Sequence, residues 1–316
     1  MLSLLSVLQI EAQKTIDLSG DWNFEIDRQD IGEKEKWFNQ TLQDVIELPG
    51  SMPERLKGDD VTVRTRWTGS LYDSSYYYNP YMEKYRREGN VKLPFFLTPD
   101  KHYVGVAWYQ KEINLPKDWK KERIVLVLER PHIESTVWVN GHKVGMQNSL
   151  CVAHIYDVTR YVRPGKCNIT IRIDNRIKEI NVGPDSHSIT DQTQGNWNGI
   201  VGRICLQATP HVYFDDIQVF PEPEQKLARV KLRIKSSNKS STTAQVRLSA
   251  ESFNAEKKHI LPVLMQEVKV KHGIAEQEIV LPMGDDMLLW DEFNPALYKL
   301  TAEISTGKGK EVKEIQ

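Results

Sequence analysis

The chain has 316 residues, which is enough for two folding units, and 27% of these residues are charged. Its 42 basic and 43 acidic residues are interspersed and give a net charge of -1, so we expect neither nucleic acid nor an anionic membrane surface as a partner. The sequence has no apolar run as long as a membrane-spanning helix.

The first ten residues, MLSLLSVLQI, form an apolar segment that is followed by the small residue Ala12. This pattern is similar to the end of a secretory signal peptide, although the segment has no basic start and no A-x-A cleavage site. We therefore expect residues 1–13 to be a signal-peptide remnant and the protein to be secreted or periplasmic. A misassigned start codon or a short apolar arm is the alternative, and neither would alter the fold.

Short alternations of apolar and polar residues, bounded by Gly, Pro, Asn and Asp, recur along the chain, whereas helical periodicity is scarce. This pattern predicts an all-β protein. The clearest alternations are residues 107–115, 123–129, 135–141, 167–174, 228–236 and 244–252.

The alternation lapses between residues 62 and 103, where ten aromatic residues occur. A long loop inside a domain is usually functional or disordered, and this one has enough aromatic surface to order itself. We expect a flap folded on the flank of the first domain. A second possibility is that one or two of its tyrosines reach over a ligand site.

Two features after this insertion predict local structure more sharply. The run IVLVLE at 124–129 is almost continuously apolar, which indicates a strand buried on both faces. Asn140-Gly141 lies between two alternating segments and predicts a type I′ hairpin, because that turn needs positive φ at both central residues. We expect Trp22, Trp108 and Trp138, which lie in strand patterns, to be core residues.

The stretch DQTQGNWNGIVGRICL, residues 191–206, is a polar loop with three glycines that leads into an apolar strand. Trp197 has a flat apolar face, and Asp191, Gln194, Asn196 and Asn198 have directional hydrogen-bonding groups. Binding a hydroxylated ring such as a sugar requires this combination. The alternative is an ordinary hairpin whose tryptophan packs in the core.

A domain boundary is expected near residues 210–225, where three prolines and several acids separate two strand-rich regions. The region from about 213 to 316 has the alternation of about seven short strands and the size of an immunoglobulin-like sandwich. We expect Trp290, Leu297 and Tyr298 to pack in its core.

The cysteines, at positions 151, 167 and 205, are too few and too scattered for a disulfide framework. One bridge is possible, but no CxxC motif or His-rich pairing accompanies them. We therefore expect no metal site and no cofactor.

Seven segments resemble, in order, the N-terminal part of family 2 glycoside hydrolases, a family that includes β-galactosidases, β-glucuronidases and β-mannosidases. These segments are residues 18–24, 47–54, 107–119, 137–145, 156–175, 196–206 and 290–300. No single segment would suffice, but their order makes the resemblance specific.

The resemblance implies a jelly-roll (galactose-binding-like) sugar-binding β-sandwich at 14–212, with its aromatic insertion at 62–103, followed by an immunoglobulin-like β-sandwich at 213–316. In the family, a TIM barrel with the catalytic carboxylates follows, and this chain stops about where the second domain ends. We therefore expect no catalytic residue in this chain, which would be inactive alone, and a β-galactosidase-like glycosidase as its parent. The catalytic barrel of the same polypeptide would be its partner.

By the same resemblance, the loop at 191–206 forms one wall of the pocket for a β-linked glycoside. The residues expected to contact sugar are Asp191, Gln194, Asn196, Trp197 and Asn198. A free-standing carbohydrate-binding or adhesion protein without catalysis is the alternative, since both folds host many functions.

Overall fold

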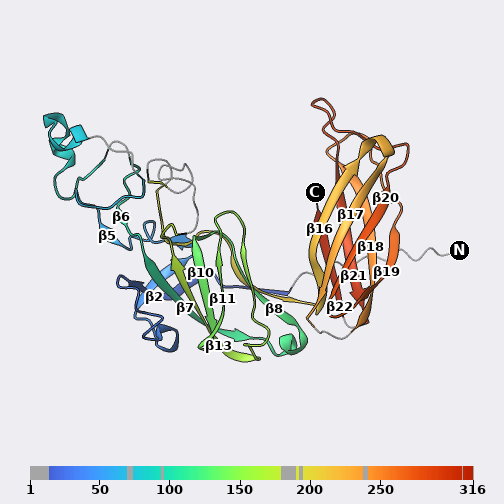
Figure 1. The fold of residues 1–316 in the computed structure, drawn as a ribbon, viewed down its shortest axis with the longest axis horizontal. Coiled ribbons are helices and arrows are strands. Elements are labelled where there is room, and N and C mark those ends of the chain that lie inside the picture. Colours follow the sequence, from blue (N-terminus) through green and yellow to red (C-terminus); the bar gives the residue numbers. More distant parts are fainter. Residues whose placement is uncertain are drawn as a thin grey trace. The chain divides into compact units, whose positions relative to one another are not determined.

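The computed structural model describes residues 14–69, 74–93, 96–178, 190–191, 195–237, 241–307 and 309–315. The expected signal-peptide remnant at 1–13 lies outside them. Two compact units are present, one from residue 15 to 207 and one from residue 208 onward. Both are built from β-strands, so the predicted all-β class is confirmed (Figure 1). Among the described residues, no helix is long and apolar enough to cross a membrane.

The first unit is a β-sandwich with two principal sheets. The strands of the six-stranded sheet are, in spatial order, β11 (His142–Asn148), β10 (Glu134–Val139), β13 (Gly165–Asp174), β7 (Val106–Leu115), β2 (Gly20–Asp27) and β3 (Asp44–Leu48). The four-stranded sheet consists of β1 (Lys14–Asp17), β15 (Ile204–Thr209), β8 (Arg123–Leu128) and β12 (His154–Asp157). All neighbouring strands of the six-stranded sheet pair antiparallel.

The first unit also contains smaller sheets and short helices. A three-stranded sheet is formed by β4 (Gly50–Ser51), β14 (Gly199–Ile200) and β9 (Pro131–His132), and a two-stranded ribbon by β5 (Asp59–Asp60) and β6 (Lys101–His102). The described 3-10 helices of the first unit are η1 (Trp37–Asn39), η2 (Ser74–Tyr77), η3 (Pro80–Tyr85) and η4 (Lys117–Lys121), and η5 (Pro223–Gln225) lies in the second unit.

The core of the first unit agrees with the sequence. Strand β8 is buried at five consecutive positions, so the prediction of a strand covered on both faces is confirmed. Trp22, Trp108 and Trp138 are at most 2% exposed, which confirms their core role. Trp108 and Trp138 lie beneath the segment around η1, where Trp37 and Phe38 cover them.

The predicted hairpin is also present. Strands β10 and β11 pair antiparallel with Val139 opposite His142, and Asn140 and Gly141 between them have φ values of 49° and 77°. Both values are positive, as a type I′ turn requires. The Asn140 side chain also accepts a hydrogen bond from the backbone N–H of Asn168, which ties the turn to β13.

The aromatic insertion contains the short helices η2 and η3. Its described residues are ordered around Tyr76, which is buried and donates a hydrogen bond from its hydroxyl to the carbonyl of Tyr85. Tyr78 and Tyr81 are exposed. Tyr72 and Phe95 lie outside the described residues, and a tyrosine reaching over a ligand stays a prediction.

The second unit is a sandwich of two antiparallel sheets (Figure 1). One consists of β16 (Val212–Glu222), β17 (Leu227–Ser236) and β20 (Ile274–Pro282), and the other of β19 (Leu264–Val270), β18 (Thr242–Phe253), β21 (Leu297–Thr306) and β22 (Gly309–Ile315). The seven strands of its described part match the predicted number. Alternate residues of β17 and β18, such as Val230 and Val246, form the core.

The predicted core role of Trp290 and Leu297 is wrong. Trp290 is 61% exposed and Leu297 is 42% exposed. Along β21 the inward positions are 300, 302 and 304, so Leu297 has the opposite parity and faces outward. Trp290 lies in the loop before β21, outside the alternating strand. Tyr298 is half-buried and packs against the core, in agreement with the expectation.

Candidate functional site

The loop that carries Trp197 is fixed by the short strand β14, which pairs with β4 on one side and β9 on the other. Gly199, the first residue of β14, has a φ of +145°, and a Cβ atom there would lie 2.4 Å from the carbonyl oxygen of Gly50. Only glycine fits this close approach of two backbones. The strand therefore determines where the preceding residues lie.

Asp191 holds the start of this loop from inside the unit. Its side chain is 0% exposed. One carboxylate oxygen accepts a hydrogen bond from the backbone N–H of Asn196, and the other accepts one from the backbone N–H of Thr68, both at 2.5 Å. The second oxygen also lies 3.5 Å from Nε2 of His102. This carboxylate ties Asp191 to the backbone of Asn196 and fastens both to the aromatic insertion.

Asn196 continues the same network and is 3% exposed. Its amide nitrogen donates to Oγ1 of Thr68 and to the backbone carbonyl of Asn175, both at 3.1 Å. Its amide oxygen accepts from Nδ2 of Asn175 at 3.0 Å. Three segments that are far apart in sequence are thus joined by one side chain.

Asn198 is fully buried and anchors the loop to the six-stranded sheet. Its amide nitrogen donates to the carbonyls of Gly105 at 3.0 Å and Ile173 at 3.1 Å, and its amide oxygen accepts from the hydroxyl of Tyr109 at 2.7 Å. Every hydrogen-bonding direction of this amide except one lone pair is therefore engaged within the unit.

Trp197 lies between these buried residues, but its own side chain is only half-buried. It borders a cleft of about 340 Å³. The other residues of this cleft, which we call the Trp197 cleft, are Ser51, Pro53, Leu97, Thr98, Pro99, Gly195 and Asn196. The lining combines an indole, prolines and hydroxyl groups, which suits a ring with both apolar and polar faces.

His132 supports Trp197 from below the cleft. The two rings stack with centroids 4.4 Å apart. His132 is 6% exposed, and Nε2 of its ring has no hydrogen-bond partner among the described residues. Burial lowers the pKa of His132 to about 4, so the ring is neutral at pH 7.

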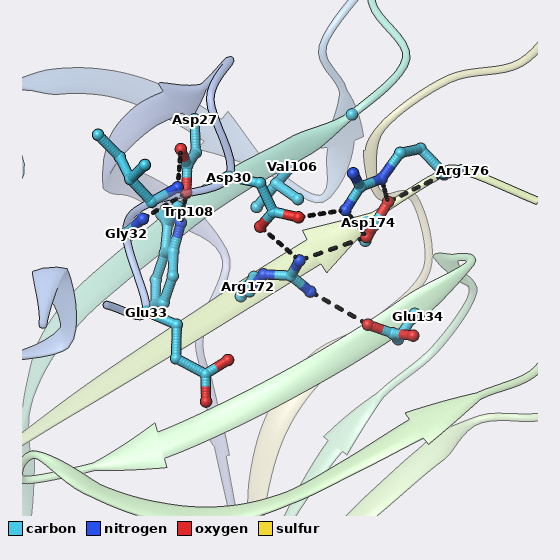
Figure 2. A network of polar contacts seen from close by, with 12 residues as sticks. Asp27, Asp30, Gly32, Glu33, Val106, Trp108, Glu134, Arg172, Asp174 and Arg176 are labelled. Atoms are coloured by element: carbon cyan, nitrogen blue, oxygen red, sulfur yellow. Dashed lines mark hydrogen bonds and ion pairs between the residues drawn. The ribbon is translucent and has the colours of Figure 1, made fainter. Parts of the chain in front are cut away.

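A charged network lies at the end of β13 (Figure 2). Arg172 forms ion pairs with Asp30 at 2.9 Å, Glu134 at 3.1 Å and Asp174 at 3.3 Å, and Arg176 pairs with Asp30 and Asp174 at 2.6 Å. Burial by itself would raise the pKa of Asp174, but the hydrogen bonds from Arg176 and from Lys178 outweigh it and hold that pKa far below its usual range. This network is structural in character, because its charges satisfy one another.

The described residues offer no group of three or more His, Cys, Asp or Glu side chains that could hold a metal ion. Cys151, Cys167 and Cys205 are all free. The single disulfide bridge that the sequence would allow is therefore not formed.

Comparison with known proteins extends these observations. Residues 15–210 match the model of the sugar binding domain of glycosyl hydrolases family 2, and residues 212–316 match a second model of glycosyl hydrolases family 2. The chain belongs to glycosyl hydrolase family 2. The resemblance inferred from the seven segments is thereby confirmed.

Family 2 relatives include several β-glucuronidases. That of Paenibacillus borealis is 25% identical over 218 residues, which are 64% of this chain and 30% of that protein. The human β-glucuronidase is 28% identical over 162 residues, covering 44% of this chain and 25% of that one. The crystal structure of Ruminococcus gnavus β-glucuronidase has a TM-score of 0.60 and 19% identity over 98% of this chain and 46% of its own. This family 2 chain thus spans less than half the length of these relatives.

Within this family 2 fold, the residues predicted to contact sugar have different placements. Trp197 borders the cleft with an accessible ring, and Gln194 lies outside the described residues. Asp191, Asn196 and Asn198 are buried and position the loop. Direct contact with a sugar stays a prediction for all five residues.

Sequence reasoning did not single out the partners of this loop. Thr68 and His102 lie in or beside the aromatic insertion, His132 ends β9, and Asn175 follows β13. No spacing motif connects them, because they are brought together by strand pairing over long sequence separations.

Proposed function

We propose that this chain is the non-catalytic N-terminal part of a glycoside hydrolase that acts on β-linked glycosides, with β-glucuronides as its substrates. The supporting observation is that matches to two family 2 models follow one another over residues 15–316. The named relatives are β-glucuronidases, which favours a β-glucuronide over the β-galactoside suggested by the sequence.

In this proposal the first unit contributes one wall of the substrate pocket. Trp197 would stack on the apolar face of a sugar ring, and the hydroxyl groups of Ser51 and Thr98 would bind the hydroxyls at its edge. Asp191, Asn196 and Asn198 would act as positioning residues that hold Trp197 at the rim. The loop would then determine which sugar fits, without taking part in bond cleavage.

The reacting carboxylates belong, in this proposal, to a part of the enzyme outside this chain. Retaining glycosidases place two carboxyl groups about 5–5.5 Å apart across the scissile bond. Two pairs of adjacent acids are instead held in surface ion pairs: Asp59 with Arg28, Asp60 with Lys101, Asp285 with Lys226 and Asp286 with Lys257. A carboxylate committed to a surface ion pair is a poor candidate for a general acid.

Activity assays test the first part of this proposal. The 316-residue chain and the full product of its gene are assayed on aryl β-glucuronide, β-galactoside and β-mannoside. We expect no turnover by the chain alone and hydrolysis of the β-glucuronide by the full product. Hydrolysis by the chain that is abolished by a point substitution within it, or a full product without glycosidase activity, would contradict the proposal.

Calorimetry on the 316-residue chain tests the role of Trp197. Its affinity for methyl β-glucuronide, galactose and mannose is measured before and after Trp197→Ala. The matched control is Trp290→Ala, which removes an exposed tryptophan from the second unit. We expect Trp197→Ala alone to weaken binding. Equal affinities in the two variants would remove Trp197 from the site.

A further inference from the structure

The first unit contains a second and larger cleft, of about 670 Å³. This volume lies in the range of about 300–1,000 Å³ that is typical of ligand sites. We call it the arginine cleft. Its lining comprises residues 59–60, 62, 64–68 and 102–106, together with Asp27, Arg28, Asp30 and Arg176.

The carboxylates at the rim of the arginine cleft are already paired with cations. Asp59 lies 2.5 Å from a guanidinium nitrogen of Arg28, and Asp60 lies 2.6 Å from Nζ of Lys101. Asp59 and Asp60 form β5, Lys101 begins β6, and Arg28 directly follows β2. The rim therefore carries little unbalanced negative charge.

The two carboxylates at its base are engaged as well. Asp30 is held by Arg172 and Arg176 in the charged network (Figure 2). Asp27 is buried, and it accepts hydrogen bonds from the backbone N–H groups of Ile31 and Gly32 and from the indole of Trp108. Asp30 is thus paired with two guanidinium groups, whereas the donors to Asp27 are all uncharged.

Arg64 and Arg66 differ from every other charged residue of the lining. Their guanidinium groups make no hydrogen bond or ion pair with any residue that the structure describes, and both residues are exposed. They are two positions apart in the sequence, and both line the arginine cleft. A guanidinium stays charged at all ordinary pH values and has the planar geometry that binds a carboxylate or sulfate through two hydrogen bonds. Within the described parts of the chain, the arginine cleft therefore has two positive charges without a counter-charge.

His102 also lines the arginine cleft, but its Nε2 atom is enclosed by protein. It is 6% exposed and packs against Trp67, and its Nε2 makes no hydrogen bond within the described parts of the chain. The nearest acceptor, Oδ2 of Asp191, is 3.5 Å away. Nε2 therefore faces the buried carboxylate of Asp191, and His102 contributes to the wall of the cleft through its ring.

We propose that the arginine cleft binds an anionic saccharide, whose carboxylate or sulfate group is held by Arg64 and Arg66. The proposal rests on the carbohydrate-binding function proposed for this unit, but it concerns a different cleft. Thr68 lines the arginine cleft and bonds to Asn196, which lines the Trp197 cleft. The two clefts are thus neighbours joined by one hydrogen-bond network.

The test is calorimetric titration of the 316-residue chain with methyl β-glucuronide, methyl β-glucoside and sodium sulfate at low ionic strength. The double variant R64Q/R66Q is compared with K120Q/K121Q, which removes two exposed charges from the same unit outside the cleft. We expect R64Q/R66Q to bind the glucuronide at least about ten-fold more weakly, and K120Q/K121Q to bind it unchanged. The glucoside should bind at least about ten-fold more weakly than the glucuronide, since it lacks the charge.

Three outcomes would contradict the proposal. Unchanged glucuronide binding by R64Q/R66Q would remove the arginine cleft as the site. Sulfate binding as tight as that of the glucuronide would make this a simple anion site. Trp197→Ala separates the two proposals: loss of all glucuronide binding in Trp197→Ala but not in R64Q/R66Q would support the Trp197 cleft and overturn this one. The reverse result would support the arginine cleft alone. Thermal unfolding of each variant verifies that it is folded.

Discussion

His132 and Trp197 stack with ring centroids 4.4 Å apart and an angle of 23° between their planes. They are brought together by backbone pairing, because His132 ends β9 and lies opposite Gly199, two residues after Trp197. The indole therefore has one face against the histidine and borders the Trp197 cleft. The position of a residue that we propose for sugar contact depends on a histidine that is itself almost fully buried.

The burial of His132 should make the first unit less stable in mild acid. Its pKa is about 4 in the folded protein, compared with an ordinary value of 6.5, so the unfolded chain binds more protons between these values. Stability conferred by the neutral ring is therefore present above about pH 6.5 and is lost as the pH falls toward 4. Between pH 7 and 5 we expect His132 to account for a loss of about 2 kcal/mol.

Urea unfolding followed by tryptophan fluorescence checks this effect, because every tryptophan except Trp290 lies in the first unit. The control is His132→Phe, which keeps an aromatic ring against Trp197 but cannot be protonated. The loss of stability from pH 7 to pH 5 should be smaller in this variant by the amount assigned to His132. An identical pH dependence in both proteins would show that His132 does not titrate in this range.

A methyl group at Gly199 should be much more damaging than one at Gly195, although both glycines have positive φ. At Gly199 the new Cβ would lie 2.4 Å from the carbonyl oxygen of Gly50, whereas at Gly195 it would meet no atom within 4 Å. We expect Gly199→Ala to cost more than about 3 kcal/mol, because β14 must separate from β4, and Gly195→Ala to cost about 1 kcal/mol from backbone strain alone. Urea unfolding of the two variants measures this difference, and equal losses would contradict the close approach.

The sequence predicted the elements whose signals are local. The continuous apolar run of β8 and the Asn140-Gly141 turn each depend on neighbouring residues, and both are present. Trp290 was misplaced because its loop and the strand after it look alike in hydrophobicity. The loop before β14 shows the same limit, since the amide of Asn198 suits an exposed ligand contact and a buried network equally well. Only strand pairing across long separations decides between these roles.

Asn198 should contribute to stability through three hydrogen bonds at once. Asn198→Ala would leave the hydroxyl of Tyr109 without its acceptor and would remove the amide donor from the buried carbonyls of Gly105 and Ile173. The carbonyl of Gly105 would keep only the long hydrogen bond of 3.4 Å from the backbone N–H of Asn175. We expect a loss of about 3 kcal/mol, since each unsatisfied buried group costs about 1–3 kcal/mol and local relaxation recovers part of it. Tyr109→Phe removes only one of these bonds and should cost about 1 kcal/mol.

The double variant Asn198→Ala/Tyr109→Phe tests the contribution of the hydrogen bond between these two residues. Once the amide is gone, the tyrosine hydroxyl has no partner, so its removal should cost less than it does in the otherwise unchanged protein. Urea unfolding of the four proteins in this cycle gives the coupling between the two residues. Strictly additive losses would mean that the bond between Tyr109 and Asn198 does not contribute to stability.

Arg172 should be essential for the first unit because it is the buried cation shared by three carboxylates. It is 7% exposed and pairs with Asp30, Glu134 and Asp174. Arg172→Met keeps much of the side-chain length but leaves these carboxylates with fewer counter-charges, and breaking a buried pair in this way costs about 3–5 kcal/mol. The matched control is Lys166→Met. Lys166 lies on β13 like Arg172, but it is exposed and pairs with Glu112 of β7, so its loss should leave the unfolding midpoint unchanged. Equal midpoints for the two variants would show that Arg176 and Lys178 alone neutralise the carboxylates, so that the positive charge of Arg172 is not required for folding.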